Sequence, residues 1–581
     1  MVQYFNKAGL GIIEFNDPDS KVNVLSISNL TCLERILTDI SSNTHTIKAL
    51  FFTSPKKDIF IAGADLKELA SIKTKKAAID LCAKGQAICN RIERLSVPTF
   101  AIVDGACIGG GLELALSCDY ILVTANKKTV IGFPESRLGI SPGFGGAHRL
   151  KERIGAKKAR YLIDTGQLLT AREAKKIRVI DGIITKAIAR DYKILSGFAR
   201  RRKRSIPNRG QGLDKQEREI LAEKIMREPA RNALSAFLLV SKYKNRVSED
   251  SDILETLGRC AVIGAGIMGR DIAYLVSLET GLPVSITDLN KTISNKARTH
   301  IKSLYRDAVK RGILYRDEAG KKLKNISFCI AGMRDCGIII ECVTEDFRLK
   351  KQVFAEIESK VRPDCIIATN TSCLSVEELG RTLKRPERFV GMHFFNPAYK
   401  MKLVEVIPAS FTDKTVMEKV NTFLRNMRRV PVIVKDRPGF LVNRMLLPYL
   451  NEAVFMLEEG FSRIAIDSAM IDFGMPKGPV ELLEDIGLGV AYRASKILED
   501  KVSDCVKVPV MLEAWADRKK ILRKKETKKA PASYVTQRLL GPIKKEAELC
   551  LNEGIADSQE IIDLTLLLGI GFPVSKRIWN V

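Results

Sequence analysis

The chain has 581 residues, which is too long for a single hydrophobic core, so we expect three or four domains. Its composition, 45% hydrophobic and 28% charged, is ordinary for a soluble globular protein. No run of about 18 apolar residues occurs, which argues against a transmembrane helix, and the N-terminal residues lack the pattern of a signal peptide. The 13 cysteines form no CxxC pair, so we expect reduced thiols, no bound metal and a cytoplasmic location.

The formal net charge is +27, and basic residues cluster at Lys73–Lys76, Arg200–Arg204 and Arg518–Lys529. A lysine-rich solvated surface is the simplest interpretation. Peripheral contact with an anionic membrane and steering of a polyanionic substrate such as coenzyme A are the alternatives. Nucleic-acid binding is disfavoured because no aromatic residues interleave with the basic clusters to stack on bases.

Residues 1 to about 190 predict an α/β domain. Apolar strand-like runs at Ile47–Thr53, Thr99–Val103 and Tyr120–Thr124 alternate with glycine-rich turns and helical stretches.

The rest of the chain changes character twice. Residues 191–257 are polar and basic, and we interpret them as a linker in which Glu217–Tyr243 forms one connecting helix. A second α/β region begins at Arg259 and extends to about Val434, and the pattern beyond Lys435 is helical.

Two glycine-rich turns in the first domain each lead into a helix, at Phe60–Leu69 and Gly109–Asp119. Backbone N–H groups at such turns can form an oxyanion hole, which stabilises the enolate of a thioester. Glu113 lies one turn into the second helix, and Glu135 follows in a Gly-Phe-Pro-Glu turn. Two carboxylates can hold one water between them, one accepting a proton while the other donates. From spacing alone, an unrelated helix acid and turn acid are the commoner explanation.

A glycine-rich motif opens the second α/β region. An apolar strand leads into Gly264-Ala-Gly266-Ile-Met-Gly269 and a helix, the arrangement in which a backbone turn approaches a pyrophosphate at a helix N-terminus. A second strand ends in Asp288, where an acid binds a ribose 2′-hydroxyl. Because this acid disfavours a 2′-phosphate, the sequence predicts NAD rather than NADP.

One of the chain's four histidines, His393, stands at the end of an apolar run and before a proline turn. Glu405 follows inside another apolar, strand-like run, and a buried carboxylate needs a partner. A His393–Glu405 pair would raise the basicity of the imidazole for taking a hydroxyl proton. A structural histidine, with Glu405 paired elsewhere, is the open alternative.

The helical C-terminal part contains an internal repeat. The segment Asn443–Gly460 (NRMLLP, then NEA and LEEG) recurs at Gln537–Gly554 (QRLLGP, then KEA and LNEG). We infer two copies of one helical unit, separated by a charged loop at Arg518–Ala532.

Several of these motifs together resemble 3-hydroxyacyl-CoA dehydrogenase over residues 258–500: GAGIMG, NTS at Asn370–Ser372, HFFNP, KLVEV and DRPGFLVNR, in this order. The resemblance implies that His393 is the general base and that Glu405 orients it. It further implies that Ser372 and Asn443 hydrogen-bond the reacting substrate oxygens, and that Glu345 and Lys350 line the cofactor side.

The N-terminal motifs IAGADLKE, DGACIGGGLELALSCD and FPESRLGISPGFGG resemble the crotonase superfamily over residues 10–190. The resemblance implies that the amides of Ala64 and Gly110 form the oxyanion hole. It also implies that Glu113 and Glu135 are the acid and base of an enoyl-CoA hydratase.

The order of the two halves resembles the α-subunit of the fatty-acid oxidation complex, or trifunctional protein. This implies a bifunctional β-oxidation enzyme that acts on acyl-CoA substrates and pairs with a 3-ketoacyl-CoA thiolase β-subunit. The linker is shorter than the family's and the second helical copy stops early, so a catalytically weakened scaffold that binds acyl-CoA or a thiolase subunit is the alternative. The predicted fold is an α/β multidomain chain with a crotonase-like spiral domain at 1–190, a linker with its helix at 191–257, a Rossmann NAD-binding domain at 258–435, an all-α dehydrogenase C-terminal domain at 436–530 and a truncated second copy of it at 531–581.

Overall fold

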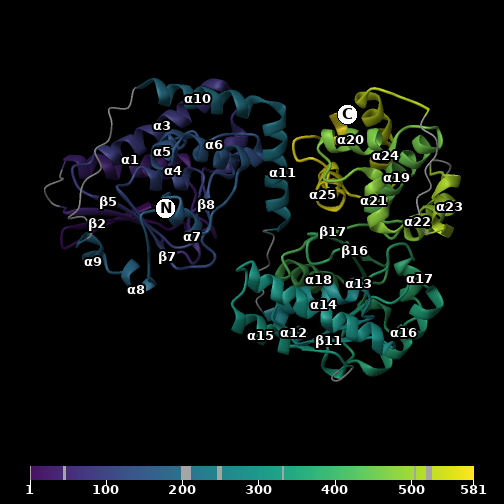
Figure 1. The fold of residues 1–581 in the computed structure, drawn as a ribbon. Coiled ribbons are helices and arrows are strands. Elements are labelled where there is room, and N and C mark those ends of the chain that lie inside the picture. The colour runs from purple at the N-terminus through teal and green to yellow at the C-terminus, as the bar shows by residue number, and fades with distance from the viewer. Residues whose placement is uncertain are drawn as a thin grey trace. The chain divides into compact units, whose positions relative to one another are not determined.

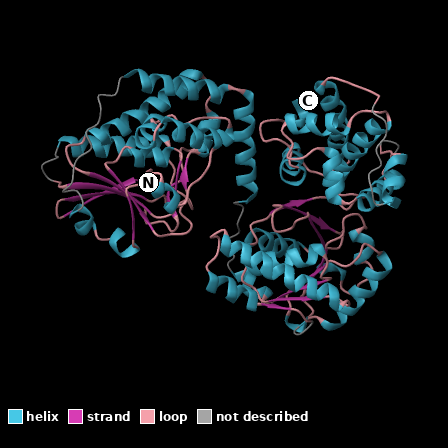
Figure 2. Ribbon diagram, in the orientation of Figure 1, coloured by secondary structure: helices cyan, strands magenta, loops and turns pink. Residues whose placement is uncertain are grey.

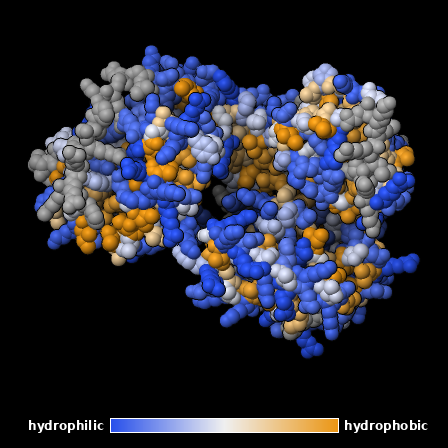
Figure 3. Space-filling model, viewed as in Figure 1, coloured by the Kyte–Doolittle hydropathy of each residue, from blue (hydrophilic) through white to orange (hydrophobic). Residues whose placement is uncertain are grey.

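The computed structural model describes residues 2–42, 47–197, 211–244, 252–329, 333–502, 506–518 and 527–580. It divides into two compact units, Met1–Leu238 and Leu239–Val581 (Figure 1). The basic cluster at Arg200–Arg204 and most of the predicted loop at Arg518–Ala532 lie outside the described residues. No helix within the described residues combines the length and the apolar character needed to cross a membrane. Hydrophilic side chains cover most of the face of each unit seen in Figure 3.

Two sheets form the centre of the first unit. Apart from the antiparallel pair β1–β2, their strands are parallel, and the predicted strands Thr99–Val103 and Tyr120–Thr124 are confirmed as β5 and β7. The larger sheet has the order β1 (Val2–Lys7), β2 (Leu10–Phe15), β3 (Ala49–Thr53), β5 (Thr99–Val103), β7 (Tyr120–Thr124) and β9 (Gly182–Ile184). The smaller sheet has the order β4 (Ile59–Ile61), β6 (Ala106–Ile108) and β8 (Ile131–Gly132).

Helices cover the strands of this unit, and Figure 2 shows most of them as a layer on one side of the sheet. Apolar side chains from the strands and from α1, α3 and α4 form its main core. The helices are α1 (Ile27–Ser42), α2 (Leu66–Ser71), α3 (Lys75–Arg94), α4 (Gly110–Leu116), the 3-10 helix η2 (Pro134–Leu138), α5 (Gly146–Ile154), α6 (Ala156–Thr165), α7 (Ala171–Lys176), α8 (Lys186–Ala189), α9 (Tyr192–Gly197), α10 (Gln211–Met226) and α11 (Glu228–Lys244). The last residues of α11, from Leu239, belong to the second unit.

The single connecting helix predicted for Glu217–Tyr243 is wrong. The chain forms two helices, α10 and α11, with a break at Arg227. The reason is Pro229, which has no backbone N–H to continue a helix but is tolerated in the first turn of a new one. α10 packs against α3 and belongs to the first unit, so this segment is part of a domain core rather than a spacer.

The second unit opens with an eight-stranded sheet that confirms the predicted dinucleotide-binding fold. All its strand pairs are parallel except β15–β16, and helices flank the sheet as expected for βαβ connections. The strand order is β12 (Ile326–Ser327), β11 (Val284–Thr287), β10 (Cys260–Ile263), β13 (Ile338–Glu341), β14 (Ile366–Thr369), β15 (Phe389–Phe394), β16 (Leu403–Pro408) and β17 (Val430–Ile433). The helices are α12 (Asp252–Leu257), α13 (Ile267–Glu279), α14 (Lys291–Lys310), α15 (Arg316–Lys324), η4 (Met333–Asp335), α16 (Phe347–Lys360), α17 (Val376–Gly380), η5 (Pro386–Arg388) and α18 (Lys414–Asn426).

The remainder of the second unit is helical, as predicted. Its apolar side chains belong to one core with side chains from one face of the sheet. Its elements are α19 (Val442–Glu458), α20 (Arg463–Phe473), α21 (Pro479–Ile486), α22 (Leu488–Lys501), α23 (Val510–Arg518), α24 (Ala532–Asn552), α25 (Gln559–Thr565), the π-helix η6 (Leu566–Ile570) and the 3-10 helix η7 (Ile578–Asn580).

The predicted repeat is visible in the pair α19 and α24, which pack against each other and each contain an internal proline, Pro448 and Pro542. Arg444 of α19 contacts Glu546 at 2.9 Å and Glu553 at 3.1 Å, both in or directly after α24. The equivalent Arg538 of α24 contacts Glu452 at 2.6 Å and Glu459 at 2.9 Å, in or directly after α19. Since equivalent residues exchange equivalent contacts, the two copies are related by an approximate two-fold axis and run antiparallel.

Candidate active sites

Glu113 sits on α4, whose seven residues are all buried. Its Oε1 accepts hydrogen bonds from the backbone N–H groups of Phe144, at 2.7 Å, and Gly146, at 2.8 Å. A Cβ at Gly146 would lie 2.5 Å from Glu113 Cγ, so the close approach requires glycine there. Burial and the nearby charge of Glu217 raise the pKa of Glu113 to about 8. The two hydrogen bonds from backbone N–H groups lower this pKa but do not offset the increase.

Glu135 lies on η2, directly after Pro134. Part of its side chain reaches solvent, but Oε2 is shielded and has no hydrogen-bond partner among the described residues. Burial and the charge of Glu113 raise the pKa of Glu135 to about 8. Gly109, at φ +54°, makes room for it, because a Cβ there would lie 2.9 Å from Glu135 Oε1. A shielded carboxyl oxygen without a partner is placed to bind a water or a substrate.

One small cavity brings together the four residues predicted for the hydration site: Ala64, Gly110, Glu113 and Glu135. Its volume is about 30 Å³, enough for one or two waters between the carboxyls. The backbone segments of Ala64 and Gly110 lie close together, since a Cβ at Gly110 would lie 3.4 Å from Ala64 N, and within the described residues neither amide donates a backbone hydrogen bond. The other lining residues are mainly apolar: Leu69, Ile72, Ala78, Leu81, Cys82, Ile140, Ser141, Gly143, Phe144, Leu221 and Ile225.

The glycine turn of the second unit has the form that a dinucleotide requires. Gly264 has φ +100°, and a Cβ there would lie 2.6 Å from the carbonyl oxygen of Cys342. A Cβ at Gly269 would lie 1.8 Å from the carbonyl oxygen of Gly264, so α13 approaches the turn closely only because both residues are glycine. Gly266, the N-cap of α13, has open space around it. The residues present therefore fit a pyrophosphate at the N-terminus of α13.

Asp288 lies directly after β11, at the carboxyl end of the sheet. Its Oδ2 accepts a hydrogen bond from Ala265 N at 2.9 Å, which ties it to the glycine turn. This is the position at which an acid would meet the ribose hydroxyls of NAD.

His393 and Glu405 face each other directly across the antiparallel pair β15–β16. His393 Nδ1 lies 2.7 Å from Glu405 Oε2, while Glu405 Oε1 accepts hydrogen bonds from Leu441 N at 2.9 Å and Val442 N at 2.8 Å. Both side chains are buried, and the ring of Phe395 lies 4.5 Å from the imidazole ring. Nε2 is the ring nitrogen left to take a proton from a substrate hydroxyl.

Ser372, Asn443 and Glu345 also come together. Asn443 Nδ2 donates to the backbone oxygen of Ser372 at 3.2 Å, and Ser372 N donates to Glu345 Oε1 at 2.6 Å. Glu345 therefore holds the loop that carries Ser372.

Lys350 is fully buried beneath this loop. Its Nζ lies 2.8 Å from Glu341 Oε1 and 3.4 Å from Glu345 Oε2. Its ammonium is thus engaged by carboxylates. Glu341 was not among the residues predicted from sequence, although an acid in an apolar strand is the same signal that identified Glu405.

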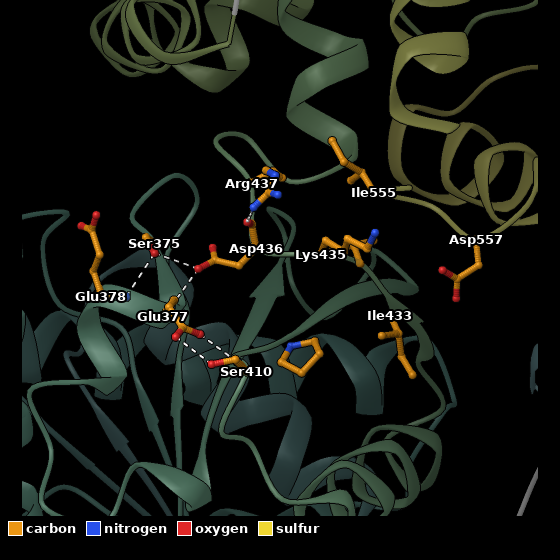
Figure 4. A pocket seen from close by; sticks show the side chains of 12 residues that line it. Ser375, Glu377, Glu378, Ser410, Ile433, Lys435, Asp436, Arg437, Ile555 and Asp557 are labelled. Carbon is orange, nitrogen blue, oxygen red and sulfur yellow. Dashed lines mark hydrogen bonds between the residues drawn. The ribbon is translucent and has the colours of Figure 1, made fainter. Parts of the chain in front are cut away.

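A further cavity, of about 450 Å³, lies where the sheet of the second unit meets the helical part (Figure 4). Figure 4 shows that two of its acidic side chains are hydrogen-bonded to serines: Asp436 accepts from Ser375 Oγ at 2.8 Å, and Glu377 accepts from Ser410 Oγ at 2.8 Å. The first bond ties the segment before Phe440 to the N-cap of α17, and the second ties α17 to the turn after β16. We interpret this cavity as a structural junction.

Three sequence families match consecutive parts of the chain. Residues 6–215 match enoyl-CoA hydratase/isomerase, residues 259–437 match the NAD binding domain of 3-hydroxyacyl-CoA dehydrogenase, and residues 439–529 match the C-terminal domain of 3-hydroxyacyl-CoA dehydrogenase. These matches confirm the predicted crotonase-like, Rossmann and helical dehydrogenase folds.

Similar proteins include two that share one description, fatty acid oxidation complex subunit alpha. The protein from Vibrio cholerae is 31% identical over 636 residues, covering 96% of this chain and 90% of that one. The protein from Idiomarina loihiensis is 30% identical over 646 residues, covering 97% and 91%. Among solved structures, (S)-3-hydroxybutyryl-CoA dehydrogenase from Ralstonia eutropha is 31% identical, with a TM-score of 0.43 and coverage of 45% of this chain and 94% of that one.

Proposed function

The chain belongs to the family of fatty acid oxidation complex alpha subunits, and on this premise we propose which of its residues carry each reaction. It is a bifunctional β-oxidation enzyme, which hydrates trans-2-enoyl-CoA to 3-hydroxyacyl-CoA and then oxidises that product to 3-ketoacyl-CoA with NAD. Two arrangements carry the assignment of residues: the two carboxyls that share one cavity and the buried His393–Glu405 pair.

For hydration, Glu113 is the base and Glu135 is the acid. The two hydrogen bonds from backbone N–H groups stabilise the ionised form of Glu113. Glu135 Oε2 has no hydrogen-bond partner among the described residues, so the carboxyl group of Glu135 is the better proton donor. Glu113 takes a proton from water as the oxygen bonds to C3 of the enoyl thioester, and Glu135 gives a proton to C2. The amides of Ala64 and Gly110 stabilise the negative charge that develops on the thioester oxygen.

For oxidation, His393 Nε2 takes the proton of the 3-hydroxyl group. Glu405 holds the imidazole through Nδ1 and stabilises the imidazolium that forms. NAD, when bound, supplies the acceptor for the hydride that leaves C3. Gly264, Gly266, Gly269 and Asp288 would hold the cofactor, Glu345 and Lys350 would shape its inner side, and Ser372 and Asn443 would bind the reacting substrate oxygens.

Acyl-CoA thioesters are the substrates of both reactions. We also propose that the chain pairs with a 3-ketoacyl-CoA thiolase β-subunit, which consumes its product, and that it acts in the cytoplasm. Peripheral membrane contact is the alternative use of its basic surface. Co-sedimentation with anionic vesicles at physiological salt, with acyl-CoA as competitor, distinguishes that contact from substrate steering.

The test supplies crotonyl-CoA and NAD⁺ to the full chain and follows NADH absorbance. Wild type should produce NADH. Glu135→Gln should abolish that signal but preserve oxidation of 3-hydroxybutyryl-CoA. His393→Ala should abolish oxidation while hydration of crotonyl-CoA continues.

If wild type turns over neither substrate at an acyl length that it binds, the scaffold alternative holds instead. If a variant abolishes both activities together, the separation of roles between the two sites is wrong.

A further inference from the structure

The turn before α5 offers its successive backbone amides alternately to two carboxylates. Phe144 N and Gly146 N donate to Glu113 Oε1, at 2.7 and 2.8 Å. Gly145 N and Ala147 N donate to Glu217 Oε1, at 3.1 and 3.4 Å. Glu217 comes from α10, in the segment interpreted from sequence as a linker.

The turn is held in a conformation that few residues adopt. Gly145 has φ +91°, and a Cβ there would lie 2.3 Å from the guanidinium of Arg149. Because the turn is tight and lies against Glu113, a small movement of its amides moves the hydrogen bonds that hold Glu113. Glu217 supplies the acceptor on the other side of the same turn.

Glu217 is itself fixed. It is buried, and its Oε2 lies 3.1 Å from His148 Nδ1. One turn earlier on α10, the backbone oxygen of Asp214 accepts from Gln86 Nε2 at 3.0 Å, and Asp214 Oδ2 accepts from Asn90 Nδ2 at 2.8 Å. Gln86 and Asn90 lie on α3, so α10 is anchored to the body of the unit at the level of the turn.

The same face of α10 also closes the cavity. Leu221 and Ile225, one and two turns after Glu217, line the cavity that contains Glu113 and Glu135. Leu221 packs so closely on the turn that a Cβ at Gly143 would lie 2.4 Å from its Cδ2. α10 therefore supports the turn and encloses the reacting groups with one surface.

We propose that Glu217 is a positioning residue of the hydration site, which fixes Glu113 through the amides of the Gly145–Gly146 turn and makes α10 part of that site. The proposal rests on the proposed function of Glu113 as the base. It extends the hydration machinery beyond the residues that the sequence motifs identify.

Glu217 also contributes a charge. Within the described residues, the ionisable groups that interact with Glu113 are Glu135 from η2, Glu217 from α10, Arg149 from α5, and Cys82 and Cys89 from α3. The negative charge of Glu217 raises the pKa of both Glu113 and Glu135. Removing this charge lowers both pKa values. Both limbs of the profile of hydration rate against pH should therefore move to lower pH.

The experiment compares Glu217→Gln and Glu217→Ala with Glu219→Gln, an exposed acid of the same helix, in the full chain. Hydration of crotonyl-CoA is measured as kcat and KM against pH, and oxidation of 3-hydroxybutyryl-CoA is measured beside it. Glu217→Gln keeps an acceptor for the amides and should move the hydration profile down by about half a pH unit. Glu217→Ala removes the acceptor and should lower kcat by about 10-fold to 100-fold with little change in KM. Glu219→Gln should match wild type, and oxidation should not change in any variant.

If Glu217→Ala lowers the unfolding temperature but leaves kcat unchanged, and if Glu217→Gln leaves the pH profile in place, Glu217 is only structural and the proposal is wrong. A failure of wild type and Glu219→Gln to hydrate crotonyl-CoA would instead refute the proposed function of the site. Should the alanine variant fail to fold, the pH profile of the glutamine variant decides.

Discussion

Glu113 and Glu135 share one cavity in the first unit that, among the described residues, no lysine or arginine lines, whereas Glu405 in the second unit is paired directly with His393. In the first arrangement, burial and like charge raise the pKa of both carboxyls, so that a proton is held within the pair. Glu113 and Glu405 each accept two backbone N–H groups on one oxygen, but Glu405 places its other oxygen against an imidazole. We infer that the first site stores a proton for transfer to carbon, whereas the carboxyl group of Glu405 in the second site orients a base.

Among the changes that test this difference between the two sites, replacing Glu113 with Gln should have the largest effect on activity. The amide removes the base while keeping the shape of the side chain, so kcat for hydration should fall about 10³-fold. Stopped-flow or steady-state assays with crotonyl-CoA measure the loss, and oxidation of 3-hydroxybutyryl-CoA serves as the control. A hydration rate near that of wild type would mean that water is activated by another group.

Replacing Glu405 with Gln should have a smaller effect. His393 keeps a hydrogen-bonding neighbour but loses the negative charge that stabilises its protonated form, so kcat for oxidation should fall about 10²-fold. Steady-state oxidation of 3-hydroxybutyryl-CoA, with NADH absorbance as the signal, measures it. Equal kcat values for this variant and wild type would show that Glu405 has no part in supporting the base.

The pH dependence of stability should show the smallest effect. The folded-state pKa of Glu135 is raised to about 8 from an ordinary value of 4.5, so the folded chain binds more protons than the unfolded chain between these values. This contribution to stability is fully present below pH 4.5 and is lost as the pH rises towards 8. Glu135→Gln cannot ionise, and it should stabilise the first unit at pH 9 by about 1–2 kcal/mol relative to wild type.

The free energy of unfolding of both proteins is measured by chemical denaturation of the full chain at pH 5 and pH 9, with a spectroscopic signal from the first unit as the readout. The same gain at both pH values would contradict ionisation of Glu135 as its cause.

Local patterns were sufficient to predict the parts of the fold and site that depend on local sequence. Two apolar runs predicted β5 and β7, and the acid within the run at Glu405 indicated a buried partner for His393. Glu217 could not be found this way, because α10 carries several acids with similar neighbours in sequence. Only the packing of α10 on α3 selects the one that reaches the Gly145 turn. The break between α10 and α11 had a local signal in Pro229, which the helical periodicity outweighed.

The reciprocal ion pairs of Arg444 and Arg538 limit how the two duplicated helices can change during evolution. Arg444 is almost fully enclosed, and its counter-charges at Glu546 and Glu553 come from the other copy. Removing the partners of a buried arginine lowers the free energy of unfolding by about 3–5 kcal/mol. Substitutions in one copy, or its loss, would therefore destabilise the other copy. Arg444 follows closely after Leu441 and Val442, whose backbone N–H groups bind Glu405. By holding Arg444, the second helical copy therefore helps to fix the position of Glu405 and, through it, of the dehydrogenase base His393.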